Sequence, residues 1–147
     1  MSEVLKICIA EKSGSIMQEK LSVDVLANKG ILNDRYFSEN NDQDIQITFI
    51  ESENIDYYNK ISGKDLPYIN FRRNIITKNI SLNDLVGKQF LVGNVKLIAH
   101  RLCDPCKYLQ DMIGDQKLVK KLHDRGGLRC EILSSGRISV NDSIKII

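Results

Sequence analysis

The sequence predicts one mainly β domain, spanning residues 1–147, in which short strands form a barrel or another closed sheet beside a few short helices. A chain of 147 residues is long enough for one hydrophobic core. Short apolar or alternating segments recur along it, separated by turn residues. No repeat, low-complexity tract or linker divides the chain.

Three segments of the first half have strand patterns. Residues 4–10, VLKICIA, form an apolar run that is typical of a buried strand. Residues 20–27, KLSVDVLA, alternate in polarity and predict a half-buried strand. The residues expected on its inner face are Leu21, Val23, Val25 and Ala27. A turn at Gly30 follows, and residues 44–50, DIQITFI, predict a third strand.

The second half is also rich in strands. Residues 71–77, FRRNIIT, resemble a strand, and residues 88–100, KQFLVGNVKLIAH, predict a hairpin. Its turn is expected at Gly93–Asn94, because such a pair suits a two-residue loop. Residues 127–147 then predict a strand, a turn, a strand, a turn and a final strand.

Short helices are expected between these strands. Residues 52–61 carry apolar side chains at helical spacing. Residues 81–87 combine a capping serine with a terminal glycine. Residues 104–114 and 115–124 predict two further short helices late in the chain.

The charge and the N-terminus limit the classes of partner. A net charge of +2 gives no overall attraction to nucleic acid or to a membrane surface, so neither partner is expected. No apolar run approaches the roughly 20 residues that a membrane helix needs. The N-terminus also lacks the basic and then apolar pattern of a signal peptide. We therefore expect a cytoplasmic protein whose four cysteines stay reduced.

The four cysteines fall into two groups. Cys8 and Cys130 are in step with apolar strand residues, which predicts packing in the core. Cys103 and Cys106 lie on either side of an Asp-Pro pair that is suited to begin a helix. Cys106 is then expected in the first turn, where unpaired amides and the helix dipole favour a thiolate. It is the candidate catalytic residue and the candidate metal ligand.

Three interpretations of the Cys103–Cys106 pair remain open. A zinc site needs about four ligands, and His123 and Cys130 are the candidates for the rest, with no second CxxC or HxxxH motif. A redox pair usually lies early in a βαβ unit, whereas this one follows a series of strands. The third interpretation is a single soft nucleophile or metal ligand beside an anion site. His100 and His123 by themselves indicate no site.

Several basic residues are candidates for such an anion site. Lys12 and Ser13 lie in a glycine-containing loop after the first strand, which suits a phosphate but is equally typical of a polar turn. Arg35 follows the turn at Gly30. Alternation along a strand predicts that Arg72 and Arg73 point to opposite faces, so that at most one of them serves a given site.

These segments, in this order, resemble the MOSC domain, which is named for the C-terminal domain of molybdenum cofactor sulfurase. The resemblance covers nearly the whole chain. Its motifs are KSGSIM, GILNDRYF, QITFIESENI, FRRNIITKNISLNDLVGKQFLVG, CDPCKYL and GGLRCEILSSGRISVNDSIKI. At this length the chain is similar to the small free-standing proteins of the family, which lack the pyridoxal-phosphate desulfurase domain of the long sulfurases.

The resemblance implies a closed, mostly antiparallel β-barrel with a few short helices. It also implies the molybdenum cofactor (molybdopterin), a pterin dithiolene that carries a phosphate and a metal. In cofactor-binding members, a cysteine equivalent to Cys106 bonds the molybdenum through sulfur. In sulfurases the domain was proposed to handle sulfur, which a thiol can carry as a persulfide.

The resemblance also assigns residues to the cofactor. Those that match the positions that contact the pterin and its phosphate are Lys12, Ser13, Arg35, Arg72 and Asn74. The sequence departs from the family at Asn33 and Asn141, where many relatives have glycine. Asparagine tolerates a left-handed backbone, so both turns are expected to survive.

The leading hypothesis is a molybdenum-cofactor-binding or sulfur-carrier protein. Its expected partners are the cofactor and either a cysteine desulfurase, which uses pyridoxal phosphate, or a molybdoenzyme. No pyridoxal phosphate site is expected in this chain. The first alternative is a molybdenum-dependent reductase of N-hydroxylated compounds, which would need an external electron donor. The second is a CxxC zinc-binding or thiol-redox protein. An enzyme would be an oxidoreductase or a sulfurtransferase.

Overall fold

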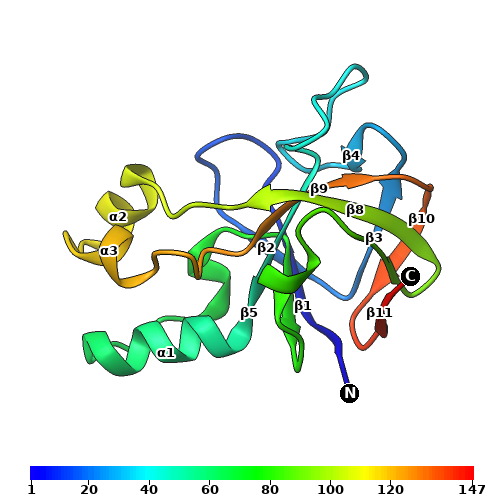
Figure 1. Cartoon of the computed structure of the whole chain (residues 1–147). Coiled ribbons are helices and arrows are strands. Elements are labelled where there is room, and N and C mark those ends of the chain that lie inside the picture. The colour runs from blue at the N-terminus through cyan, green and yellow to red at the C-terminus, as the bar shows by residue number, and fades with distance from the viewer.

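Strands make up most of the regular structure, as predicted, in a computed structural model that describes all 147 residues (Figure 1). The strands are β1 (Glu3–Ile9), β2 (Gln18–Lys20), β3 (Ser22–Leu26), β4 (Gly30–Ile31), β5 (Ile47–Glu51), β6 (Ile75–Lys78), β7 (Gln89–Val92), β8 (Val95–Leu102), β9 (Leu128–Ile132), β10 (Gly136–Ser139) and β11 (Ile144–Ile146). The helical segments are α1 (Ser52–Ser62), α2 (Lys107–Ile113), α3 (Leu118–Lys121) and the 3₁₀ helices η1 (Tyr68–Phe71) and η2 (Leu82–Leu85).

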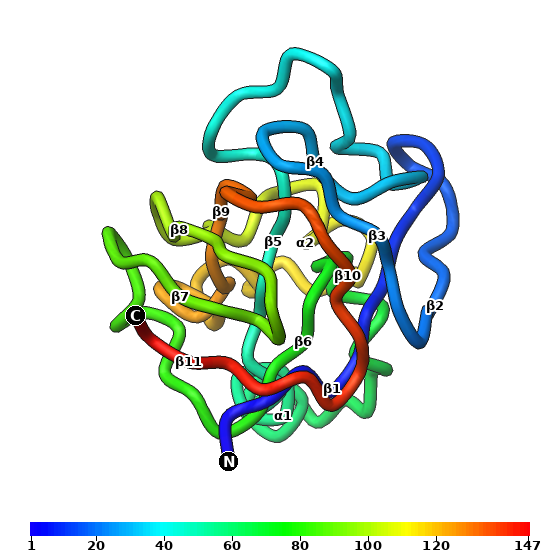
Figure 2. Tube along the Cα trace, turned by 90° about the vertical axis from the view of Figure 1, so that its right-hand side faces the viewer, coloured from blue at the N-terminus to red at the C-terminus, as the bar shows by residue number.

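The strands form two sheets, and the predicted closed barrel is wrong. The larger sheet has eight strands in the order β11-β7-β8-β9-β5-β6-β1-β2, and the smaller has the order β10-β3-β4. All pairs are antiparallel except β5 with β6. The large sheet curls until β1 meets the start of β11, where Glu3 and Ser143 form an isolated bridge (Figure 2). No continuous ladder joins them, so the sheet is an open half-barrel.

The chain changes from the large sheet to the small one at Leu21. The segment 20–27 is not one strand, because β2 pairs with β1 in the large sheet while β3 pairs with β10 in the small one. Leu21 lies at this change of sheet and is 83% exposed instead of facing the core. Val23 and Val25 are buried as expected. The chain thus passes from the edge of the large sheet directly into the small one.

Two hydrophobic clusters cover the two faces of the central strands. The larger cluster fills the inside of the curved sheet, where Phe49 and Phe90 pack edge to face with ring centroids 5.6 Å apart. The second lies under the helices and contains Tyr58 of α1. Successive residues of β6 alternate between them: Ile75 belongs to the first cluster and Ile76 to the second. Strands buried on both faces explain the continuous apolar runs of the sequence.

Asn74 links three neighbouring strands from within this core. It is fully buried just before β6. Its Oδ1 accepts hydrogen bonds from the amide and the hydroxyl of Thr48, at 3.0 and 3.1 Å. Its Nδ2 donates to the carbonyl oxygen of Cys8 at 3.1 Å, and the Cys8 amide donates to the Asn74 carbonyl at 2.7 Å. One side chain therefore holds β1 and β5 against the start of β6.

Several local predictions are confirmed. The hairpin turns at Gly93–Asn94 between β7 and β8, and α1 covers the helix expected at residues 52–61. Asn33 and Asn141 both have left-handed backbones, with φ of 72° and 75°. Ser81 precedes η2 but makes no side-chain cap. None of the helices has the length and apolar character needed to cross a bilayer.

We predict that Asn74→Ala lowers the free energy of unfolding by about 2–4 kcal/mol, because it leaves buried groups of Thr48 and Cys8 without partners. Chemical denaturation followed by circular dichroism measures this difference. Asn83→Ala is the matched control, since Asn83 is exposed and donates a single bond to the Asp124 carbonyl oxygen. Its expected cost is about 0.5 kcal/mol. Equal losses in the two variants would contradict the linking role of Asn74.

Candidate functional site

The Cys106 cavity, with a volume of about 330 Å³, is the candidate site. It lies where the loop after β1, the connection between η1 and β6, the segment before α2 and strand β9 meet. Four arginines and two tyrosines share its wall with one cysteine. The lining residues are Ser13, Gly14, Arg35, Tyr36, Arg72, Arg73, Asp104, Cys106, Tyr108, Leu109 and Arg129.

Cys106 is exposed to this cavity. The sequence predicted that it lies in the first turn of a helix, and this prediction is wrong. Cys106 is the N-cap residue of α2, with an extended backbone (φ −116°, ψ 165°), and the helix begins at Lys107. Asp104 therefore does not cap the helix. At the start of this segment, the Cys103 amide donates to the Gly127 carbonyl at 2.7 Å. The first helical bond is the one from Gln110 to the Cys106 carbonyl, at 3.0 Å.

The other cysteines are buried, and all four are free thiols. The prediction of core packing for Cys8 and Cys130 is confirmed. Burial is the main cause that raises the pKa of Cys8 to about 11 and the pKa of Cys130 well above its usual value. Cys103 is only 1% exposed. The exposed Cys106 is therefore the thiol that a molecule in the cavity can reach.

The zinc interpretation lacks a ligand set. No group of three or more histidine, cysteine, aspartate or glutamate residues is arranged to hold a metal ion. His123 is exposed and lines a different, polar cavity together with Glu51 and Asp124. Cys130 belongs to the larger core cluster. The two residues considered as further ligands thus lie in places other than the wall around Cys106.

Arg35 and Arg72 form one end of the cavity wall. Arg35 Nη1 lies 3.1 Å from Asp34 Oδ1, and its Nη2 donates to the Arg72 carbonyl at 2.8 Å. Its guanidinium also stacks on the ring of Tyr36, 4.3 Å from the centroid. Arg72 Nη1 donates to the Ser15 carbonyl at 3.0 Å. These contacts place both guanidinium groups beside the loop that follows β1.

Arg72 and Arg73 both line the cavity, so the prediction that only one of them faces a given site is wrong. They precede β6 and are not part of a strand. Arg72 has a left-handed backbone, with φ of 58°, directly after η1. The strand alternation that separates neighbouring side chains therefore does not apply. Arg73 Nε donates to the Gly126 carbonyl at 2.9 Å, whereas Arg72 donates to the Ser15 carbonyl.

Two of the residues assigned by resemblance are not part of the wall. Lys12 is exposed and does not line the cavity, although Ser13 next to it does. The backbone of Lys12 instead closes a tight turn with Ser15, whose hydroxyl donates to the Lys12 carbonyl at 2.7 Å. Asn74 is fully buried, and its amide is used to link the strands.

Three residues of the wall were missed in the sequence. Tyr36 follows Arg35 directly and Tyr108 lies two residues after Cys106, and their rings lie near Arg35 and Arg72 respectively. Arg129 lies on β9 between Leu128 and Cys130, which both face the core. Strand alternation would have placed Arg129 on the opposite face. Its Nε is buried and has no hydrogen-bond partner.

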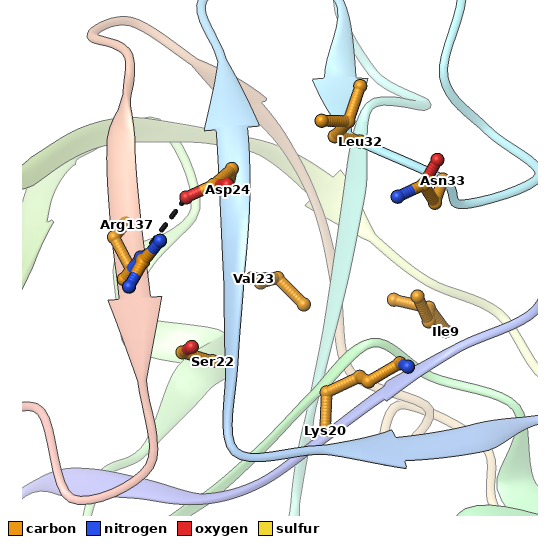
Figure 3. A pocket seen from close by; sticks show the side chains of 8 residues that line it. All are labelled: Ile9, Lys20, Ser22, Val23, Asp24, Leu32, Asn33 and Arg137. Carbon is orange, nitrogen blue, oxygen red and sulfur yellow. Dashed lines mark hydrogen bonds and ion pairs between the residues drawn. The ribbon is translucent and has the colours of Figure 1, made fainter.

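Other hollows lie apart from the thiol. A cavity of about 210 Å³ between β3 and the end of β1 contains the Asp24–Arg137 ion pair, with no cysteine or histidine in its wall (Figure 3). An apolar groove of about 320 Å³ lies next to the Cys106 cavity and shares Arg72 with it. Ile16, Ile69 and Met112 are among the apolar residues of this groove.

Comparisons with solved structures agree with this fold. The YUAD protein from Bacillus subtilis superposes with a TM-score of 0.86 at 16% identity, over 99% of this chain and 96% of that one. YiiM from Geobacillus stearothermophilus gives 0.81 at 14% identity, over 100% and 75%. YiiM from Escherichia coli gives 0.71 at 14% identity, over 99% and 68%. At these identities the likeness establishes the fold alone.

A search of curated proteins found no significant match. The family comparison is positive: the model of the MOSC domain matches residues 34–145. This range includes Arg35, Arg72, Cys106 and Arg129, and it covers most of the 147 residues. The chain therefore belongs to the MOSC domain family.

Proposed function

We propose that the protein binds the molybdenum cofactor in the Cys106 cavity and uses the Cys106 thiolate as a sulfur ligand or as a carrier of persulfide sulfur. The observation that carries this proposal is the position of one exposed thiol in a wall with four arginines. Membership of the MOSC family, which is associated with this cofactor, supports it.

The donors of the cavity fit an anionic, planar ligand. A guanidinium has five N–H donors, and the protein contacts of Arg72 and Arg73 use few of them. The remaining donors suit a phosphate, for which arginine provides paired hydrogen bonds. Tyr36 and Tyr108 add aromatic surface. Cys106 contributes a soft sulfur ligand. When bound, the cofactor would supply a redox-active metal and its dithiolene sulfurs.

Sulfur transfer would use the same thiol. The Cys106 thiolate would attack the outer sulfur of a persulfide on a cysteine desulfurase. A new S–S bond then forms on Cys106 while the donor's S–S bond breaks, and the donor leaves as a thiolate. The exposure of Cys106 allows this approach, whereas the buried Cys103 cannot be reached in the same way.

The reductase of N-hydroxylated compounds is the second candidate. One observation favours it: the apolar groove meets the Cys106 cavity at Arg72, so the two hollows adjoin. A small organic substrate could place its apolar body in the groove and its polar end near the thiol. Electrons for such a reaction would come from a separate protein.

The first test compares the two cysteines of the CDPC segment. We predict that Cys106→Ser abolishes molybdenum and pterin retention in protein purified from a cofactor-producing host, as well as persulfide loading by a desulfurase. Cys103→Ser should retain most of both, because its side chain is buried. Elemental analysis, fluorescence of the oxidised pterin and peptide mass mapping measure these quantities. Equal losses in both variants would support a paired CxxC function instead.

The second test concerns the anion-binding residues. Arg72→Gln should weaken cofactor binding by about 1.5–3 kcal/mol, because it removes a charged hydrogen-bond donor from the wall. Titration of the apo protein with purified cofactor measures the affinity. Lys12→Gln is the matched control: it removes a charge from the nearby loop, outside the wall, and should change the affinity less than about twofold. A larger effect at Lys12 than at Arg72 would contradict this assignment.

A further inference from the structure

The four arginines of the Cys106 cavity form two groups that are anchored to different parts of the chain. Arg35 and Arg72 are bonded to each other through the Arg72 carbonyl and lie against the loop after β1. Arg73 and Arg129 are associated with the Gly126–Gly127 segment and β9 instead. Arg73 Nε donates to the Gly126 carbonyl, and Arg129 lies on β9 two residues beyond Gly127.

The Gly126–Gly127 backbone also positions the thiol segment. The Cys103 amide donates to the Gly127 carbonyl, and a side chain added at Gly126 would meet the Cys103 carbonyl and the ring of Pro105. This close contact fixes the start of the CDPC segment against the same backbone that holds Arg73. Arg73 and Arg129 are therefore the arginines that share a support with the Cys106 segment.

The four arginines also differ in charge compensation, because only Arg35 forms an ion pair. Arg35 forms a buried ion pair with Asp34, in which the side chains are 6% and 0% exposed. Arg72, Arg73 and Arg129 form no ion pair, although Arg72 and Arg73 are only 9% and 8% exposed. The known contacts of Arg73 are two carbonyl oxygens. A buried cation without an opposite charge is costly, so such a group is usually paired.

Arg129 has the least compensation of the four. Its Nε is the one buried side-chain nitrogen or oxygen without a hydrogen-bond partner. The charge of Arg129 contributes to the lowered pKa of Asp44, but it is the last of the causes. The first cause is the hydrogen bond between Asp44 and Arg101, so Asp44 is mainly the partner of Arg101. Asp104 contributes a carboxylate to the wall, but it is exposed and forms no ion pair. Arg73 and Arg129 thus bring positive charge to the cavity wall that no ion pair compensates.

We infer that Arg73 and Arg129 form a second anion subsite, separate from the Arg35–Arg72 end, which binds an oxyanion group on the molecule that reacts at Cys106. The inference rests on the proposed function to the extent that Cys106 is the reacting thiol. The class of ligand is a compact molecule with a carboxylate, sulfonate, sulfate or phosphate group. A cavity of about 330 Å³ can hold such a group together with the reacting atoms.

The test uses the alkylation of Cys106 in the full-length, cofactor-free protein. Iodoacetate carries a carboxylate and iodoacetamide does not, so the ratio of their rate constants reports the attraction of an anion to the thiol. Peptide mass mapping measures the alkylation rate of Cys106 with each reagent. Each rate is then divided by the rate at which the same reagent alkylates free N-acetylcysteine. We expect Arg129→Gln and Arg73→Gln to lower this ratio by roughly tenfold, the low end of electrostatic focusing in a cleft.

Matched variants separate the subsite from a general effect of charge. Arg137→Gln removes an exposed arginine that pairs with Asp24, away from the Cys106 cavity, and should leave the ratio unchanged. Arg72→Gln should lower it less than Arg129→Gln does. Arg129→Lys keeps the charge and should keep most of the ratio. Thermal melts confirm that each variant is folded. If Arg73→Gln does not fold, the Arg129 variants decide the outcome.

A competition experiment distinguishes the sources of the anion. Sulfate, phosphate and acetate are added at constant ionic strength while iodoacetamide alkylates Cys106. Protection by sulfate or phosphate alone assigns a tetrahedral oxyanion, and protection by acetate assigns a carboxylate. The protection should disappear in Arg129→Gln and persist in Arg72→Gln. If no anion protects Cys106 and the ratio of the iodoacetate and iodoacetamide rates is unchanged in the variants, the subsite is overturned. If Arg72→Gln and Arg129→Gln have equal effects, the cavity contains one anion site instead of two. The alkylation experiments use protein without cofactor. Their outcome therefore does not depend on whether the protein binds molybdenum.

Discussion

The side-chain amide of Asn74 is the interaction on which the rest of the site depends. It joins β5 and β1 to the start of β6 inside the core. Two chain segments connect this junction to the cavity: the residues just before Asn74 and the residues just after Cys8. Two residues before Asn74 comes Arg72. Two residues after Cys8 comes Ala10, whose amide donates to Asp34 at 3.1 Å and whose carbonyl accepts from the Arg35 amide at 2.7 Å. The strand junction therefore sets the positions of both arginines at that end.

The two core clusters hold the rest of the cavity wall in position. The central strands are packed on both faces, and α2 rests on the second cluster through Leu109, which is also part of the cavity wall. The thiol segment thus lies between a packed helix and the buried glycines before β9. Tight packing on both sides means that a change in a side chain at either support is felt by the thiol segment.

The strands were predictable because polarity patterns report local burial. Cys8 and Cys130 could be assigned to the core for the same reason, and the left-handed turns at Asn33 and Asn141 follow from the tolerance of asparagine. The open sheet, and the division of residues 20–27 between two sheets, were not predictable, since both depend on strand pairing. That choice is made by partners far away in the sequence, and periodicity does not identify them.

The site residues were predictable in part, for reasons that differ between residues. Arg35, Arg72, Ser13 and Cys106 do meet in one cavity, although the sequence separates them widely. The amide of Asn74 can form hydrogen bonds either to a ligand or to neighbouring strands. Which of these it does depends on whether the side chain is buried, and the sequence alone does not show that it is. Arg73 was misplaced because the left-handed backbone at Arg72 removes the alternation on which its prediction relied.

Most of the arginines around the thiol are held by main-chain oxygens. The carbonyl groups of Ser15, Arg72, Phe71 and Gly126 accept from Arg72, Arg35 and Arg73. Every amino acid has this carbonyl group, so a single codon change at an acceptor position leaves the acceptor in place unless it moves the backbone. The Asp34–Arg35 pair is different, because one substitution can remove its acceptor. Substitution at the partly exposed Ser15 can therefore leave its anchor in place, whereas a side chain at Gly126 would meet the Cys103 carbonyl and would move the backbone.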